Sequence, residues 1–235
     1  MAKTGAAQLL GEILPEMPPA RWPERVTLEG RTVIVRPLNA VADAKPLYTH
    51  TLGRHELWTY LLAGPFADRA AFDAYLHNMV AAADRVAYAI VDKTSFEVTG
   101  LCCYLRIEPA HRTIEIGSIV YSPKLQRTAM ATEAMYLMAR YAFEELGYRR
   151  YEWRCNALNA ASHRAATRLG FTLEGIFRQH MIVKGRNRDT AWFAMLNSEW
   201  PARKAALEQW LAPSNFDDDG RQKKTLKEFQ SLQSQ

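Results

Sequence analysis

Glu115 is the residue whose position most clearly suggests chemistry, because it places a carboxylate inside a run of apolar, β-branched residues. A carboxylate on a buried strand needs a charged partner or a raised pKa. Such a group can act as a general base that takes a proton from an ammonium, directly or through a water. Side-chain alternation puts it on the same face as Ile119 and Tyr121. The alternative interpretation is a structural ion pair with Arg106 or Arg150.

The loop after this strand, from Lys124 to Thr128, leads into a segment with helical spacing of apolar residues, which predicts a helix over residues 130–145. The N-terminus of a helix offers unpaired N–H groups and a positive dipole end, and both favour a phosphate. Lys124 and Arg127 add positive charge to the loop. The pattern also fits an ordinary strand–helix connection, so the loop alone does not identify a ligand.

Two blocks of residues carry a resemblance to a known family. Gln126-x-x-Ala129-x-Ala131 resembles the Q/R-x-x-G-x-G/A signature of the GNAT superfamily of acyl-CoA N-acetyltransferases, whose loop wraps the pyrophosphate of coenzyme A. Residues 156–175 resemble the N-x-x-S…LGF-x-x-EG block of the RimJ/RimL-like branch. Both blocks, in this order and at this distance, are more specific than either alone. The resemblance covers about residues 28–196.

Ala129 departs from the family signature, which usually has glycine at this position. Alanine disfavours a left-handed backbone. Either the loop keeps a negative φ there, or the grip on the cofactor is altered.

The resemblance implies an enzyme, an acetyl-CoA-dependent N-acetyltransferase. The acetyl group of acetyl-CoA is expected to pass by direct attack to a primary amine, either a protein N-terminus or a small molecule. The residues expected to bind this cofactor are Ile119, Val120, Tyr121, Gln126, Arg127, Thr128, Ala129, Met130, Ala131, Thr132, Asn156, Asn159 and Ser162.

Glu115 and Ser162 are the expected catalytic residues. In the family, the serine at the position of Ser162 implies a hydroxyl near the thioester sulfur that can protonate the departing thiolate. Its alternative is a first-turn serine that bonds the backbone, in a short helix capped by Asn159. A rival chemistry uses Cys155 as an acyl-carrying nucleophile, but this thiol needs an activating base, and the sequence places none beside it.

The acceptor pocket is expected to include Trp58, Tyr60, Tyr104 and His180. Aromatic residues at such spacings are also common in cores. His180 stands beside Met181, where some family members carry a glutamate, so the role of that glutamate cannot be transferred.

A basic turn is expected at residues 184–188, which include Lys184, Arg186 and Arg188. This turn is either a solvated hairpin tip or a grip on an acidic substrate or on the cofactor's phosphate.

The predicted fold is α/β (α+β), with a mixed, mostly antiparallel, seven-stranded sheet flanked by helices. A helix joins the strands at 113–121 and 150–155, which predicts a parallel pair, and the resemblance implies that this pair splays at the cofactor site. We expect an N-terminal arm over residues 1–27 with a short helix at 6–14. An acetyltransferase domain over 28–197 follows, and then a C-terminal helix and polar tail over 198–235. The tail from residue 212 is expected to be mobile or weakly docked.

Composition limits the class of protein. The 235 residues are 48% hydrophobic and 23% charged, which is typical of a soluble globular chain. No apolar run is long enough for a membrane span or a signal peptide. Three cysteines make no disulfide framework, and no Cys/His cluster has metal-ligand spacing. We therefore expect a cytoplasmic protein without a metal; a homodimer is compatible with these features.

Two rival classes remain open at this point. A non-catalytic acyl-CoA-binding or sensing module is suggested by Ala129. A nucleic-acid-binding module is suggested by the net charge of +5 and by Arg149-Arg150-Tyr151. A mildly basic chain suits a polyanionic cofactor without demanding nucleic acid, so nucleic acid is not the expected partner.

Overall fold

The computed structural model describes residues 9–233, and its centre is an eight-stranded sheet in the order β1-β2-β3-β4-β5-β6-β8-β7. The strands are β1 (Leu28–Glu29), β2 (Val33–Pro37), β3 (Val86–Asp92), β4 (Val98–Glu108), β5 (Thr113–Tyr121), β6 (Arg150–Asn156), β7 (Thr172–Val183) and β8 (Arg186–Leu196). Strands β5 and β6 pair in parallel, and the other neighbours pair antiparallel. The predicted fold class is confirmed. The eighth strand is the two-residue β1, which is too short to show alternation in the sequence.

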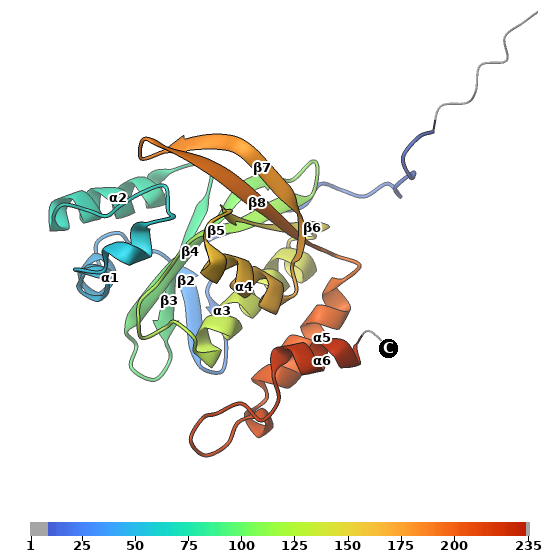
Figure 1. The fold of residues 1–235 in the computed structure, drawn as a ribbon. Helices are drawn as coiled ribbons and strands as arrows, with labels where there is room; N and C mark the ends of the chain where they lie inside the picture. The colour runs from blue at the N-terminus through green and yellow to red at the C-terminus, as the bar shows by residue number, and fades with distance from the viewer. Residues whose placement is uncertain (1–8, 234–235) are drawn as a thin grey trace, which may run out of the picture.

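Helices cover both faces of the sheet (Figure 1). They are α1 (Ala44–Thr51), α2 (Arg69–Ala81), α3 (Ala129–Arg140), α4 (Ala160–Leu169), α5 (Trp200–Leu211) and α6 (Leu226–Leu232), with short 3-10 turns η1 (His55–Trp58) and η3 (Pro213–Asn215) and a π-helical turn η2 (Tyr141–Glu145). Alternate residues of β3 belong to different core clusters. Tyr88 and Ile90 pack with α3 and α5, whereas Ala87 and Ala89 pack with α1 and α2.

The parallel pairing of β5 with β6 runs from Thr113 opposite Arg150 to Ile116 opposite Trp153 and then ends. Strand β6 continues to pair with β8 as far as Asn156. Strand β5 contains a bulge, because two of its residues lie between Gly117 and Val120 where β4 has one. A bulge of this kind bends its strand and leaves one residue unpaired. The sheet is therefore open between the last residues of β5 and β6.

The C-terminal segment differs from the expected mobile tail. After α5 the chain forms η3 and then α6, and α6 contacts both α5 and α4. Thr225 and Glu228 form a reciprocal capping box at the start of α6, and Leu226 is buried in the main core. The sequence did not predict that this segment packs on the domain, because its elements are short and are separated by polar residues.

The N-terminal arm contacts the domain from Met17 onward: Arg112 Nη1 donates to the Met17 sulfur at 3.0 Å, and the Arg21 N–H donates to the Leu146 carbonyl. The helix expected over 6–14 lies partly outside the described residues, and residues 9–14 have no regular structure. Within residues 9–233, no helix is long and apolar enough to cross a membrane.

Glu133 ties helix α3 to the turn between β1 and β2. Its side chain is buried and accepts hydrogen bonds from the N–H groups of Arg31 (2.6 Å) and Thr32 (2.8 Å), and from the Thr32 hydroxyl. This carboxylate satisfies donors of a tight turn that has few other partners.

Removing the Glu133 carboxylate leaves these partly buried donors without their partner. We expect Glu133→Ala to lower the free energy of unfolding by about 3 kcal/mol, the order for lost charged hydrogen bonds and exposed desolvation penalties. Urea unfolding measures the change. The exposed strand residue Glu108 supplies the control, and Glu108→Ala is expected to stay close to wild type. Equal stability of the two variants contradicts this role for Glu133.

Candidate active site

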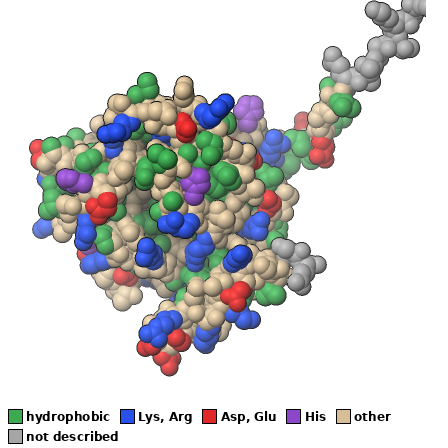
Figure 2. Space-filling model, in the orientation of Figure 1, with side chains coloured by type: hydrophobic (Ala, Val, Ile, Leu, Met, Phe, Trp, Pro, Cys, Tyr) green, Lys and Arg blue, Asp and Glu red, His purple; other side chains and the backbone are tan. Residues whose placement is uncertain are grey.

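A cavity of about 1740 Å³ passes through the opening between β5 and β6. On one side it reaches α2 and the segment around Tyr60; on the other it reaches α3, α4 and the C-terminal segment around Trp210. The face of the molecule seen in Figure 2 is hollowed, and Lys and Arg side chains surround the hollow. The predicted residues that line the cavity are Tyr60, Glu115, Ile119, Val120, Tyr121, Gln126, Arg127, Thr128, Ala129, Ala131, Thr132, Asn159, Ser162 and His180.

Glu115 is buried on β5 immediately before the opening, with 4% of its surface exposed. Arg154 of β6 donates to its Oε2 from Nε at 2.7 Å and, more closely, from Nη2. The Nε atom of Arg106 lies 3.4 Å from the same oxygen. The other oxygen, Oε1, accepts no hydrogen bond from the described residues, and a Cβ at Gly117 would lie 3.0 Å from it. One carboxylate oxygen is therefore held and the other is left free beside a glycine.

The charge state of Glu115 is set by two opposing effects. Burial raises its pKa to about 8, against the positive charge of Arg106. The hydrogen bonds from Arg154 also favour the ionised carboxylate. The predicted ion pair with Arg106 is present, but Arg150 instead pairs with Glu152 and Glu174.

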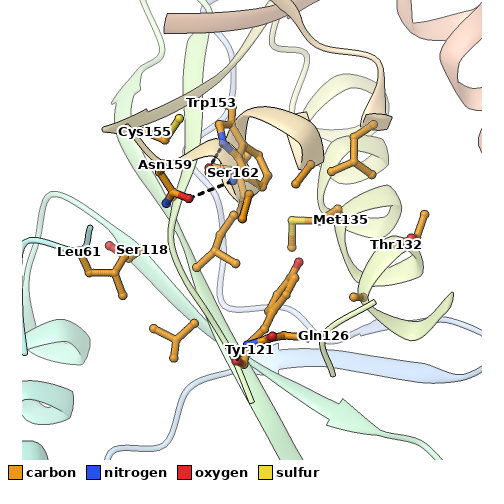
Figure 3. Close-up of a pocket in the computed structure, with 18 of the residues that line it drawn as sticks. Leu61, Ser118, Tyr121, Gln126, Thr132, Met135, Trp153, Cys155, Asn159 and Ser162 are labelled. Carbon is orange, nitrogen blue, oxygen red and sulfur yellow. Dashed lines mark hydrogen bonds between the residues drawn. The ribbon is translucent and has the colours of Figure 1, made fainter. Parts of the chain in front are cut away.

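Ser162 lies in the first turn of α4, where its backbone N–H donates to Asn159 Oδ1 at 3.1 Å. The Ser162 Oγ accepts a hydrogen bond of 2.9 Å from Trp153 Nε1 (Figure 3). The predicted cap by Asn159 is thus present. The hydroxyl oxygen is held by an indole rather than by backbone, and the hydroxyl also reaches the Cys155 thiol, which lines the same cavity.

Cys155 stands next to this pair, and burial raises the pKa of its thiol. The Ser162 hydroxyl opposes this effect. A raised pKa keeps the sulfur protonated, whereas a nucleophilic cysteine needs the thiolate. The site therefore disfavours an acyl-cysteine route.

The loop before α3 explains the departure at Ala129. Thr128 caps the helix by accepting from the Ala131 N–H at 3.1 Å, and Ala129 is the first helical residue. The left-handed conformation falls on Arg127, with φ of 60°. Ala129 keeps a negative φ, so no glycine is needed there. Lys124 lies outside the cavity lining, because it is held by Glu97 at 2.7 Å.

Four predicted site residues do not line the cavity. Trp58 is 2% exposed and packs against Phe66, Phe72 and Tyr75. Tyr104 is fully buried, and its hydroxyl donates to the Met138 carbonyl. Met130 packs on the main core, and Asn156 accepts from the Leu158 N–H in a turn. Trp58 and Tyr104 are core aromatics instead of pocket residues, the alternative that their spacing left open.

Sequence reasoning missed Arg154 and Arg168, and it noted Arg188 only as part of a hairpin tip. Arg154 and Arg188 reach the cavity around Glu115, and Arg168 reaches it beside Trp210. The only signal in the sequence was that each of these arginines stands on a strand or helix that also carries apolar residues. That pattern does not reveal which distant element lies opposite.

The family model of the acetyltransferase (GNAT) domain matches residues 32–172. This chain belongs to the GNAT family of N-acetyltransferases. The resemblance noted in the sequence is confirmed, including the RimJ/RimL-like branch. The family uses acetyl-CoA and acts on amines.

Solved structures support the assignment along nearly the whole chain. A GCN5-related N-acetyltransferase from Brucella melitensis is 49% identical, with a TM-score of 0.91, over 93% of this chain and 100% of that one. A probable GNAT-family acetyltransferase from Chromobacterium violaceum is 40% identical, with a TM-score of 0.78, over 84% of this chain and 100% of that one. YnaD of Bacillus subtilis, an uncharacterized N-acetyltransferase, is 34% identical over 89 residues, or 37% of this chain. That match spans about half (51%) of this curated relative's length.

Thiol reactivity tests the burial of the three cysteines, of which Cys155 lines the cavity. Burial raises the pKa of Cys102, Cys103 and Cys155, so we expect all three to react slowly with a disulfide reagent at pH 8. The same chain in denaturant, where the thiols are exposed, is the control and should react at once. Rapid labelling of Cys155 in the folded protein, located by mass spectrometry, contradicts this description.

Proposed function

We propose that this chain transfers the acetyl group of acetyl-CoA directly to a primary amine, of a protein N-terminus or of a small molecule. In this proposal Glu115 is the general base and Ser162 assists the leaving thiolate. The observation that carries the proposal is one continuous cavity. It joins the free oxygen of Glu115 to the N-terminus of α3 through the opening between β5 and β6.

The side of the cavity around α3 fits a pyrophosphate. The first turn of α3 leaves backbone N–H groups without intrahelical partners. Arg127 is exposed beside it, and no carboxylate within residues 9–233 forms an ion pair with it. Both features favour an anion, and together they make residues 126–132 the proposed cradle.

Beyond this cradle, Arg168 of α4 offers a second positive charge. Its Nη1 donates to Thr132 Oγ1 at 2.9 Å, and its guanidinium lies 4.6 Å from the ring centroid of Trp210. Burial lowers its pKa, and no acidic side chain among residues 9–233 pairs with it. We propose that this group faces the phosphates at the nucleotide end of the cofactor.

On the acceptor side, the chain's own groups handle the proton of the incoming ammonium. Acetyl-CoA supplies the acetyl group as an activated thioester. Glu115 Oε1 accepts a proton from the ammonium, while Arg154 holds Oε2 in place. Backbone N–H groups at the bulge near Ile119 and Val120 are proposed to polarise the acetyl carbonyl.

Ser162 would donate its proton toward the sulfur position, since its oxygen already accepts from Trp153. The indole hydrogen bond fixes the rotamer of the hydroxyl and makes the serine a better donor. The rival interpretation of a non-catalytic acyl-CoA module rested on Ala129. The negative φ of that residue removes this support.

The cofactor assignment predicts a contrast between the two loop cations. Arg127→Ala should weaken acetyl-CoA binding about tenfold or more, the scale of a lost charge-assisted contact. Lys124→Ala is the matched control, because Glu97 holds Lys124 outside the cavity, and its affinity should change less than about twofold. Isothermal calorimetry measures both. Equal losses, or none, refute the assignment of Arg127.

The assignment of Glu115 predicts a change in both rate and pH dependence. Only the deprotonated carboxylate accepts a proton, so wild-type kcat/KM should rise with pH as Glu115 loses its proton, at a pKa that burial has raised. Glu115→Gln should lower kcat about 10²–10⁴-fold and abolish that limb, while acetyl-CoA affinity stays near wild type.

Glu56→Gln provides the control for Glu115, because Glu56 is an exposed carboxylate on the same cavity. Its rate and pH profile should match wild type. Release of free thiol from acetyl-CoA with an amine panel gives the rates. A Glu115→Gln enzyme that melts early yet keeps its rate and its pH limb would make Glu115 a structural residue.

A further inference from the structure

The acceptor side of the cavity carries an excess of positive charge. Three guanidinium groups, those of Arg106, Arg154 and Arg188, line the cavity near the carboxylate of Glu115. The two other carboxylates nearby have arginine neighbours of their own, Arg54 for Glu56 and Arg150 for Glu152. Arg106 and Arg154 share that carboxylate. Arg85, also on the wall, is neutralised by Asp84. The positive charge that remains faces the region where the acceptor must bind.

Arg188 lacks an anionic partner. It projects from β8, half-buried, and within residues 9–233 no carboxylate lies within 4 Å of its guanidinium. Its hydrogen bonds are long, 3.3 Å from Nε to Thr190 Oγ1 and 3.5 Å from Nη1 to the Tyr60 carbonyl. Most of its five N–H donors are therefore available. Burial lowers its pKa, and the charge of the neighbouring Glu115 offsets this effect only in part.

The position of Arg188 suits a ligand rather than a structural pair. Lys184, at the hairpin tip, donates to the Trp58 carbonyl at 2.7 Å, so β8 is anchored against the segment that contains Tyr60. This anchoring holds Arg188 at the junction between β8 and the acceptor wall. A guanidinium fork fits a carboxylate or a phosphate in bidentate geometry.

We propose that the acceptor of this enzyme is an amine that also bears an anionic group, a carboxylate or a phosphate, and that Arg188 binds this group. The proposal rests on the acetyltransferase function proposed above and adds the chemical class of its substrate. Polyamines carry only positive charges, so the excess positive charge of the cavity wall disfavours their binding. The excess positive charge also lowers the pKa of the reacting ammonium, so it eases loss of the proton to Glu115.

Matched acceptor pairs test this proposal, with acetyl-CoA as donor and thiol release as the readout. The first series consists of pairs of short peptides. The two members of a pair differ either at the second residue, Glu or Gln, or at the C-terminus, carboxylate or carboxamide. A second pair is phosphoethanolamine and ethanolamine, which separates phosphate from carboxylate recognition. Spermidine represents the polycations. We expect wild type to favour the anionic member of at least one pair about tenfold or more, mainly through KM.

Arg188→Gln should reduce that preference to about twofold or less while leaving the neutral members nearly unchanged. Arg186→Gln is the matched control, since Arg186 is an exposed arginine on the same hairpin outside the cavity, and it should keep the wild-type preference. Equal use of anionic and neutral members, efficient use of spermidine, or an unchanged preference in Arg188→Gln overturns the proposal.

Binding separates failure of this inference from failure of the catalytic proposal. Acceptor affinity for the CoA-bound protein is measured by calorimetry with the same pairs. If no amine is acetylated but the anionic members still bind better and lose this advantage in Arg188→Gln, the catalytic proposal fails and the anion site stands. If amines are acetylated without any such advantage, the anion site fails alone.

Discussion

The structure depends on the early end of the parallel pairing between β5 and β6, which lasts for four residue pairs. Beyond Ile116 and Trp153, β5 bulges toward β4 and β6 stays with β8. Backbone groups at such an edge need a partner or solvent, so the opening suits an extended polar ligand. The proposed base lies just before this opening on β5, and the capped helix α3 begins just after it. The sheet, rather than a flexible loop, sets the spacing between the two proposed subsites.

Two buried glutamates show how similar chemistry gives different roles. Glu133 is surrounded by donors from a single turn, and both of its oxygens are used. Glu115 has its arginine contacts on one oxygen and keeps the other toward the cavity. The first arrangement stabilises the packing of α3 on β2. The second leaves one carboxylate oxygen without a hydrogen-bond donor from residues 9–233, which the proposed proton transfer requires.

Local features of the sequence predicted much of the fold, and non-local pairings account for what it missed. The β5 strand, the helix after it and the Asn159 cap follow from alternation, helical spacing and capping chemistry, which act within a few residues. Tyr104 and Trp58 were misplaced because spacing does not say whether an aromatic faces a cavity or a core. The Arg154 contact with Glu115 joins residues 39 positions apart, and Arg188 meets Tyr60 across 128. The docking of α6 was missed because its apolar residues are few and dispersed.

The opening in the sheet has a consequence for the order of binding. Side chains from α2 lie on one face and those from α3 and α5 on the other, yet both groups border the same cavity. With the cofactor on the α3 side and the acceptor on the α2 side, as proposed, the two substrates would approach the centre from opposite faces of the sheet. Geometry of this kind permits a ternary complex to assemble by either route and lets each product leave without waiting for its neighbour. An obligatory order of substrate binding would then have to come from a conformational or electrostatic change, because neither substrate blocks the path of the other.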